Sequence, residues 1–374
     1  MEKNRRVLVG MSGGIDSSIV CLLLMNQGYD VVGVTIRMWD SPRHFKEGGD
    51  VPDYILSARR LAERLGIPHY VLDARESFKK EVVDYFTFEY LNGRTPNPCV
   101  RCNCMIKWKM MASFAEEMGC WYLATGHYAK IVHQNGNYYV SKGEDEQKDQ
   151  SYFLWDVESS LWERVLFPLG GMKKEETRKL AKKMGYTDLY TQKESMEICF
   201  VESDYRDFLR ENCTEQLAQI GQGDYVDREG RKLGFHEGYP FYTIGQRKGL
   251  RIALGTPAYV LKINPLKNTV MIGEKSDIEV REMVVENFRI TDKRDFSQTL
   301  QVQIRYRSSG KSAKITFVDD TLLLVEFEDV ATAVTPGQSA VFYKDGVVLG
   351  GGIIGSDKSL KVAKKRLKRQ SEEG

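Results

Sequence analysis

Strand-like and helix-like segments alternate over the first 131 residues, and this alternation limits the possible folds more than any other feature of the sequence. Short apolar runs typical of buried strands are separated by longer segments whose apolar residues recur at helical spacing. The expected strands are residues 5–11, 31–39, 69–74 and 121–131, and the expected helices are residues 17–30, 53–66, 77–93 and 106–119. The alternation predicts an α/β fold with a parallel sheet covered by helices on both faces. Ligands of such folds bind at the carboxyl ends of the strands.

The character of the sequence changes after about residue 205. Residues 221–250 are rich in glycine and aromatic residues and contain hairpin-like turns, which suggests a small connecting domain. Five strand-like segments follow and predict a small antiparallel β-barrel: residues 281–290, 300–309, 312–320, 321–329 and 339–354. We therefore expect domains at residues 1–205, 206–278 and 279–356, and a charged tail at residues 357–374 that is disordered or a frayed helix.

Composition restricts the compartment and the partners. The formal net charge of the 374 residues is only +2, so a nucleic-acid partner requires a local basic patch. The first apolar run is too short for a signal peptide, and no stretch approaches the roughly 18 apolar residues of a membrane span. Seven cysteines, an odd number without an export signal, indicate a reducing compartment. We expect a cytoplasmic protein with no membrane partner.

The sequence MSGGIDSS, residues 11–18, lies between the first expected strand and helix. Its two glycines permit positive φ angles and close approach of a phosphate, and its serines offer hydroxyl donors. Asp16 is placed to hold the helix start or a magnesium ion. The plain alternative is a strand–helix turn with an aspartate cap.

The pattern S-G-G-x-D-S resembles the PP-loop of the ATP pyrophosphatases, which bind ATP and split it between the α- and β-phosphates. Such a loop holds pyrophosphate as a leaving group, and this explains why the lysine of a Walker loop is absent.

The cysteines provide the second chemical signal. Cys99 and Cys102 form a C-x-x-C pair, followed by Cys104, but no second pair stands nearby to complete a zinc site. The proline before the pair and the helix after it would place Cys99 or Cys102 near a helix N-terminus, where thiol pKa values fall. Cys199 lies in a polar segment, and taken alone it would more often be structural than catalytic.

Several long strings together resemble one family, the tRNA-specific 2-thiouridylases. They are spread over all three expected domains and comprise VGMSGGIDSS, GRTPNPCVRCN, LATGHYA, KDQSYFL, EICF, YTIGQRKGL, RYRS and TPGQSAVFY. The resemblance implies a PP-loop (adenine nucleotide alpha hydrolase-like) domain. It also implies an ATP-dependent enzyme that replaces the carbon-2 oxygen of the wobble uridine of tRNA with sulfur. ATP, Mg²⁺, tRNA and a sulfur-donor protein, either a cysteine desulfurase or a sulfur-relay protein, are the expected cofactors and partners.

The resemblance also implies roles for individual residues. Cys199 would receive a persulfide, and Cys102 would attack it and release the sulfur onto the adenylated base, leaving a disulfide to be reduced. The positions implied to bind ATP are Gly10, Met11, Ser12, Gly13, Gly14, Ile15, Asp16, Ser17, Ile36 and Gly126. Those implied to contact tRNA are Asn97, Pro98, Cys99, His127, Lys148, Asp149, Gln150, Arg305, Tyr306 and Gln338. Separately, Arg247, Lys248 and Arg251 beside Tyr242 suggest a phosphate-binding patch, although solvated hairpin charges explain them equally well.

One position departs from the family pattern. Many members have an aspartate where this chain has Cys99, and a thiol there could still move a proton. Alternatively, Cys99, Cys102 and Cys199 form a three-thiolate set for a [4Fe–4S] cluster that carries sulfide. We place the persulfide route first. Two other classes remain open: another PP-loop adenylating enzyme, which would not need Cys199, and a non-enzymatic RNA-binding protein, against which the intact loop and the cysteines argue.

Overall fold

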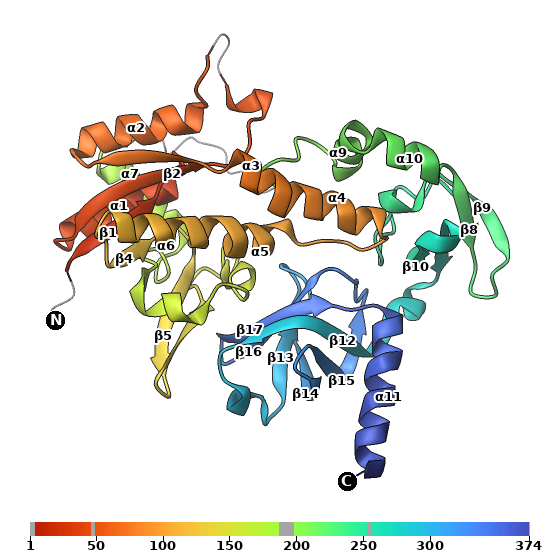
Figure 1. Ribbon diagram of the computed structural model, residues 1–374. Helices are drawn as coiled ribbons and strands as arrows, with labels where there is room; N and C mark the ends of the chain where they lie inside the picture. The colour runs from red at the N-terminus through yellow and green to blue at the C-terminus, as the bar shows by residue number, and fades with distance from the viewer. Residues whose placement is uncertain (1–3, 46–48, 187–197, 253–255, 374) are drawn as a thin grey trace. The chain divides into compact units, whose positions relative to one another are not determined.

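The computed structural model describes residues 4–45, 49–186, 198–252 and 256–373, and Figure 1 shows its ribbon. The chain divides into two compact units. The first unit comprises residues 1–82, 99–202 and 345–348, and the second comprises residues 83–98, 203–344 and 349–374. Within the described residues, none of the helices has both the length and the apolar character needed to span a membrane.

The first unit contains a five-stranded parallel sheet in the order β3-β2-β1-β4-β7. Its strands are β1 (Arg6–Gly10), β2 (Asp30–Arg37), β3 (His69–Asp73), β4 (Tyr122–Ala124) and β7 (Val165–Leu166). Residues Val7, Leu8 and Val9 of the central strand β1 are completely buried, as expected for a strand covered on both faces. The predicted parallel sheet is confirmed. The two-residue strand β7 is not among the expected strands.

Helices cover both faces of this sheet, as the alternating pattern predicts. α1 (Ile15–Asn26), α2 (Asp53–Leu65) and α7 (Lys174–Lys183) share one apolar cluster with the β1 residues Val7 and Val9. α6 (Trp108–Glu117) contacts β1 and β4, and Figure 1 shows it on the opposite side of the strands from α2. The carboxyl ends of the strands are therefore left open between the two helical layers.

One expected strand proves to be two. Residues 121–131 were expected to form a single strand, but β4 ends at Ala124, and β5 (Ala129–Gln134) pairs instead with β6 (Asn137–Lys142) in a hairpin. The chain leaves the parallel sheet after Ala124 because the partner strand β1 ends at Gly10, one residue beyond the last pairing of Val9 with Ala124. The segment TGH thereby becomes a loop at the edge of the sheet.

Two expected helices contain π-helical turns. The first consists of α3 (Arg75–Phe78), a π turn at Lys79–Val83 and α4 (Asp84–Leu91). The second begins earlier than expected, with α5 (Pro98–Cys102), and continues through a π turn at Asn103–Lys107 into α6. A proline is favoured as the first residue of a helix because its missing N–H would have had no partner there.

The second unit contains a small sheet and a barrel. After α9 (Tyr205–Asn212) and α10 (Thr214–Ile220), the small sheet has the order β10-β11-β8-β9. Its strands are β8 (Gly223–Val226), β9 (Lys232–His236), β10 (Tyr259–Asn264) and β11 (Thr269–Gly273). The barrel strands are β12 (Glu279–Ile290), β13 (Leu300–Gln303), β14 (Lys311–Asp319), β15 (Leu322–Thr332), β16 (Ser339–Lys344) and β17 (Val347–Ile354). They follow the order β12-β15-β14-β13-β16-β17, and pairing of β12 with β17 closes the barrel, which confirms the predicted antiparallel barrel.

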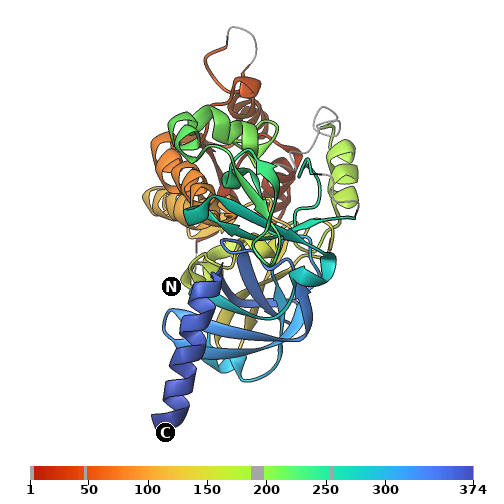
Figure 2. The ribbon, with the colours of Figure 1, turned by 90° about the vertical axis from the view of Figure 1, so that its right-hand side faces the viewer.

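The C-terminal segment is a helix, which agrees with one of the two expected alternatives, whereas the alternative of a disordered tail is wrong. Helix α11 (Asp357–Glu373) lies against the outside of the barrel strands in both views (Figures 1 and 2). Leu360, Ala363 and Leu367 pack on an apolar cluster of β12, β14 and β15. Burial of this apolar stripe outweighs the high charge of the segment.

Candidate active site

The glycine-rich loop connects the carboxyl end of β1 to α1. Gly13 has a φ of +73°, and a Cβ there would lie 2.3 Å from the carbonyl oxygen of Tyr54. The Ser17 hydroxyl donates to the Gly14 carbonyl at 3.1 Å and accepts from the Ser12 amide at 3.2 Å. No described side chain caps α1 at Gly14. The first amides of the helix therefore point out of a loop that its own hydroxyls hold in shape, an arrangement suited to an anion.

Asp16, in the first turn of α1, is held from two sides. Lys174 Nζ lies 2.8 Å from its Oδ1 and 2.7 Å from its Oδ2, and the Tyr128 hydroxyl donates to Oδ1 at 2.9 Å. Lys174 begins α7, and its side chain is only 10% exposed. Both Asp16 oxygens lie within hydrogen-bond distance of Lys174, and Asp16 stands in the first turn of α1, so its expected part in holding the helix start or a magnesium ion stays a prediction. The loop sequence itself contains no lysine, but Lys174 of α7 places a cation beside the loop.

The three cysteines singled out in the sequence come together in the first unit. Partly buried Cys99, buried Cys102 and exposed Cys199 interact electrostatically with one another. The Cys102 sulfur lies 3.6 Å from the sulfur of Met38, which follows the carboxyl end of β2. The thiols thus gather at the same edge of the sheet as the glycine-rich loop.

The expected lowering of the thiol pKa values does not occur. Burial raises the pKa of Cys99 to about 11 and that of Cys102 to about 12, and the charge of Lys107 opposes these shifts only in part. Loss of water around sulfur penalises the thiolate more than the start of a helix favours it. Both groups are therefore protonated thiols at neutral pH, and any reaction that uses them as nucleophiles must first remove a proton.

Sequence reasoning missed Lys107. In an α-helix, residues five apart point about 140° away from each other, whereas a π turn with its i to i+5 bonds brings them to one face. The π turn Asn103–Lys107 therefore directs Lys107 toward Cys102, five residues earlier. Burial lowers the pKa of Lys107, whereas the thiolate forms of the three cysteines raise it, and the net shift is upward. The sequence shows a lysine five residues after Cys102, but it does not predict the π turn that directs this lysine toward the cysteines.

His127 and the neighbouring positions line the same edge. His127 Nδ1 lies 2.7 Å from the Thr125 hydroxyl oxygen, and its ring stacks on Trp108 with 6.1 Å between the ring centroids. Burial, helped by the charge of Lys107, lowers the pKa of His127 to about 3, which keeps the ring neutral. Gly126 approaches the loop so closely that a Cβ would lie 2.9 Å from the Asp16 Cβ. Ile36 is a partly buried residue of β2.

The segment Lys148–Asp149–Gln150 is anchored largely by its own polar groups. The Asp149 carboxylate accepts from the Gly143 amide at 3.0 Å and from the Ser151 amide and hydroxyl at 3.2 and 2.9 Å. Gln150 Oε1 accepts from the Tyr128 amide at 3.1 Å, next to the ring that holds Asp16. Asp149 and Gln150 therefore shape the backbone at this position, whatever else they contact.

The remaining expected tRNA-contacting residues belong to the second unit. Gln338 Nε2 donates to the carbonyls of Thr95 and Pro96 at 3.1 and 3.0 Å, and so fixes the backbone just before Asn97 and Pro98. Exposed Arg305 donates to the Thr332 carbonyl at 2.9 Å, and partly buried Tyr306 follows it in the turn after β13. The structure thus assembles the loop, the cysteines and His127 within one unit, and Asn97, Pro98, Arg305, Tyr306 and Gln338 within the other.

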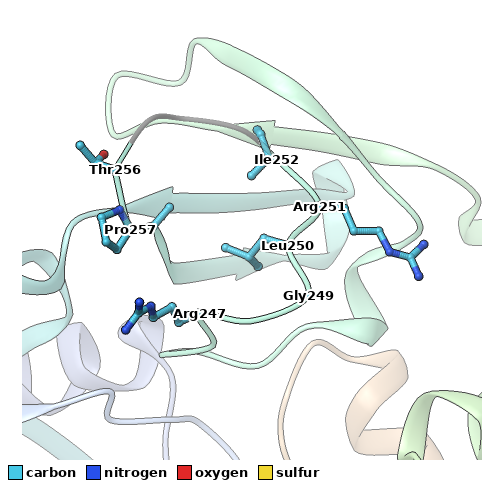
Figure 3. Close-up of a pocket in the computed structure, with 8 residues that line it drawn as sticks. Arg247, Gly249, Leu250, Arg251, Ile252, Thr256 and Pro257 are labelled. Atoms are coloured by element: carbon cyan, nitrogen blue, oxygen red, sulfur yellow. The ribbon is translucent and has the colours of Figure 1, made fainter.

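The expected phosphate patch of the second unit is only partly available. Tyr242 is buried and packs edge-on against Tyr225, so its ring is not offered to a nucleotide. Arg247 and Arg251 line a cavity of about 500 Å³ (Figure 3), and Arg251 points away from Leu250 toward Glu237, with which it forms an ion pair. Arg247 is the cation of the expected patch that remains at this cavity.

The described residues do not form a site that fits an iron–sulfur cluster. Within residues 4–45, 49–186, 198–252 and 256–373, no three histidine, cysteine, aspartate or glutamate side chains stand together as metal ligands. The three thiols share an electrostatic environment but not the geometry of a ligand set.

A parallel sheet with a lysine-free glycine-rich loop and gathered thiols at its carboxyl edge defines a nucleotide-binding α/β enzyme with sulfur chemistry. Residues 5–203 match the family described as tRNA methyl transferase HUP domain, residues 206–274 the tRNA methyl transferase PRC-barrel domain, and residues 280–354 the aminomethyltransferase beta-barrel domain. The chain is 49% identical over 363 residues to the tRNA-specific 2-thiouridylase MnmA 3 of Phocaeicola vulgatus, covering 96% of this chain and 97% of that protein. The chain belongs to the family of tRNA-specific 2-thiouridylases.

Other relatives agree. The tRNA-specific 2-thiouridylase MnmA of Clostridium acetobutylicum is 43% identical over 357 residues, with 94% of this chain and 99% of that protein covered. Solved structures are more remote. A 4-thiouridine synthetase–RNA complex with bound ATP is 17% identical and covers 56% of this chain and 50% of that chain, with a TM-score of 0.34, which is too low to bear on function.

Proposed function

We propose that this protein uses ATP to replace the carbon-2 oxygen of a tRNA uridine with sulfur, which passes through Cys199 and Cys102. Membership of the 2-thiouridylase family supports the reaction. The observation that carries the cysteine roles is the gathering of Cys99, Cys102 and Cys199 around the charged Lys107, at the sheet edge that also bears the glycine-rich loop. A methyl transfer, which the matched family descriptions mention, would need neither this loop nor these thiols.

The loop supports the activation step. A uracil carbonyl between two nitrogens is a poor electrophile, and its oxygen is a poor leaving group. Attack of that oxygen on the α-phosphate of ATP releases pyrophosphate and leaves the oxygen as part of AMP, which departs readily. The free amides of α1 and Lys174 favour the phosphates electrostatically. Magnesium that accompanies ATP would be held by the phosphates, with Asp16 as the expected carboxylate beside them.

The thiols support the transfer step. A persulfide on Cys199 carries the sulfur, and the Cys102 thiolate attacks the Cys199 sulfur. The S–S bond of the persulfide breaks, and a Cys102–Cys199 disulfide forms while sulfide leaves. The sulfide attacks carbon 2, and AMP leaves with the oxygen. Two electrons from an external thiol then reduce the disulfide. Lys107 favours the Cys102 thiolate, because its charge lowers the pKa that burial raises.

The exposure of the thiols supports the order of the transfer. Cys199 is exposed, whereas Cys102 is buried. An external sulfur-donor protein would therefore reach Cys199 first, and the buried Cys102 would meet only the sulfur that Cys199 brings. Cys99, which stands where many relatives have an aspartate, would move a proton between these groups.

The decisive experiment is thiolation of unmodified tRNA with ATP and a sulfur donor, using protein purified without oxygen. Cys102→Ala and Cys199→Ala should each abolish 2-thiouridine, measured by mass spectrometry of digested tRNA. Cys104→Ala is the control for loss of a thiol, because Cys104 is a partly buried cysteine in the π turn directly after Cys102. Cyanide-releasable sulfur should be found on wild-type protein and on Cys102→Ala, but not on Cys199→Ala.

Iron content, measured on the same samples, separates the two sulfur routes. Thiolation by iron-free protein would support the persulfide route. If activity rises with bound iron and disappears in Cys99→Ala, the persulfide assignment fails. If wild-type protein exchanges pyrophosphate with ATP but thiolates no tRNA, another adenylating function replaces the one proposed here.

A further inference from the structure

Helix α11 packs on the barrel through one face only. Counted at 100° per residue, Leu360, Ala363 and Leu367 lie within about 60° of one another around the helix, and all three pack on the barrel. Gln370 also donates to the Val318 carbonyl at 3.2 Å from this side. The orientation of α11 about its own axis is thereby fixed, and so is the identity of its outward face.

The outward face is a stripe of unpaired cations. Residues 358–371 contain seven lysines and arginines and no acidic residue. Four of these cations are exposed and form no ion pair within the described residues: Lys358, Lys361, Lys365 and Arg369. At 100° per residue they fall within an arc of about 80°, opposite the packed face, and they extend over about 17 Å of the helix. We call these four residues the basic stripe.

The other three cations of this segment behave differently. Lys364 pairs with Glu282 and Arg366 with Asp319, both of the barrel, and Lys368 lies 3.8 Å from Glu372. The cations on the two sides of α11 are therefore explained by ion pairs within the chain. The acidic residues of these ion pairs form no ion pair with the basic stripe, which faces away from the barrel.

Folding alone does not explain the basic stripe. Lysine and arginine stabilise the last turn of a helix through its dipole, but Lys358 and Lys361 occupy the first turns, where a positive charge is unfavourable. Like charges three and four residues apart also repel each other. Four such residues on one face therefore weaken the helix unless an anionic partner neutralises them.

We propose that the basic stripe of α11 binds the phosphate backbone of the tRNA substrate, as a contact independent of sequence. This proposal rests on the proposed function for its ligand. With a net charge of only +2, the chain has little overall attraction for RNA, so a local stripe has a large effect. A membrane surface fits less well, because the apolar residues that would enter it are packed on the barrel and Val362 is the one exposed apolar residue of the helix. The matched family descriptions end at residue 354, before α11 begins.

The test compares two triple variants of equal charge in the full-length protein. Lys361→Gln, Lys365→Gln and Arg369→Gln remove cations of the basic stripe, whereas Lys364→Gln, Arg366→Gln and Lys368→Gln remove paired cations of the same helix. The tRNA dissociation constant is measured from 50 to 300 mM KCl without ATP. Each lost phosphate contact should reduce the slope of log K against log[KCl], the salt slope, by about 0.7 to 0.9. The basic-stripe variant should therefore lose about 2 to 3 in slope and bind on the order of tenfold more weakly at low salt. Its KM for tRNA should rise while kcat stays unchanged, and the control variant should keep the wild-type slope.

The possible results separate this proposal from the proposed function. Equal slopes for the two variants would overturn the proposal, even if both thiolate tRNA normally. If wild-type protein binds tRNA but does not thiolate it, the function fails, and a lower slope for the basic-stripe variant alone would still support the contact. Stronger binding to vesicles of anionic lipid than to tRNA, lost in the same variant, would assign the basic stripe to a membrane and overturn the proposal. Circular dichroism at 222 nm, matched across the variants, guards against loss of the helix.

Discussion

Lys174 Nζ lies 2.7 Å from a carboxylate oxygen of Asp16, although 158 residues separate the two in the chain. The Tyr128 hydroxyl links this pair to Thr177 on α7 at 3.0 Å, and Asp16 opens the helix that follows the glycine-rich loop. The loop is therefore attached to α7 by a charged pair in which the Lys174 side chain is largely buried and Asp16 is partly exposed. Phosphates that enter the loop meet a cation that is already in position.

Replacing Lys174 should weaken ATP binding. In Lys174→Met, Asp16 keeps its charge without its partner, so both the loop and the fold lose support. We expect ATP to bind at least tenfold more weakly and the free energy of unfolding to fall by about 1–2 kcal/mol, since Asp16 remains partly solvated. Isothermal titration and urea unfolding measure the two effects.

Two further variants identify the cause. Lys179→Met removes an exposed lysine of the same helix, paired with Glu175, and should behave like wild type. Asp16→Asn with Lys174→Met removes both charges and should recover stability but not ATP affinity. Recovery of ATP affinity in this double variant would show that Lys174 serves only to neutralise Asp16.

Gly13 and Gly28 allow steric conflict to be separated from backbone strain. Both have positive φ angles, +73° and +79°, but a Cβ at Gly28 meets nothing within 4 Å. Gly28→Ala should cost about 1–2 kcal/mol, the strain of the left-handed conformation. Gly13→Ala adds the conflict with Tyr54 and should cost about 3 kcal/mol in total and abolish ATP binding. Chemical denaturation measures the difference, and equal losses would contradict the described loop.

His127 should make the protein sensitive to acid. Burial and the charge of Lys107 lower its pKa to about 3 in the folded state, compared with about 6.5 when unfolded. The unfolded state therefore binds a proton below pH 6.5 that the folded state does not accept. The stabilising contribution is complete above pH 6.5 and is lost as the pH falls toward 3, at about 1.4 kcal/mol per pH unit. His127→Gln should flatten the dependence of unfolding free energy on pH between 6 and 4.5. An imidazole NMR titration of His127 with a midpoint near 6.5 would contradict this.

The Cys102 thiol should react faster as the pH rises, without a plateau. Because burial raises its pKa to about 12, the thiolate fraction should increase tenfold per unit between pH 7 and 10. Lys107→Met removes the charge that favours the thiolate and should slow iodoacetamide alkylation at every pH in that range. Mass spectrometry of protein that retains only Cys102 among its cysteines gives the rates. A plateau by pH 8 would instead indicate a low pKa.

The sequence predicted those parts of the structure that depend on local periodicity. Buried runs such as Val7–Val9 and the amphipathic residues of α2 follow from spacing alone, and so does the position of the glycine-rich loop between strand and helix. Segment 121–131 was misread because its apolar character continues past the point at which β1 ceases to offer a partner. No pattern within a single segment contains that information.

The site depended more strongly on contacts between distant residues. Lys174 reaches Asp16 only because two helices far apart in the chain pack together. Lys107 is directed toward Cys102 only by a π turn, which no residue type in the segment predicts. The thiol pKa values went up rather than down because burial, which only the packed structure reveals, exceeded the influence of the helix start.

Phe200, the neighbour of Cys199, is buried between Trp39 and Phe78, with ring centroids 6.2 and 5.7 Å away. Cys199, an exposed residue whose thiol pKa is raised by burial, is thus attached to an anchored residue whose Cα lies about 3.8 Å from its own. The volume that its sulfur can search is therefore small, and the local concentration of sulfur seen by a partner thiol in the same unit is correspondingly high. Such a short tether lets a sulfur carried by a surface residue react as if it were part of the same small molecule as its acceptor.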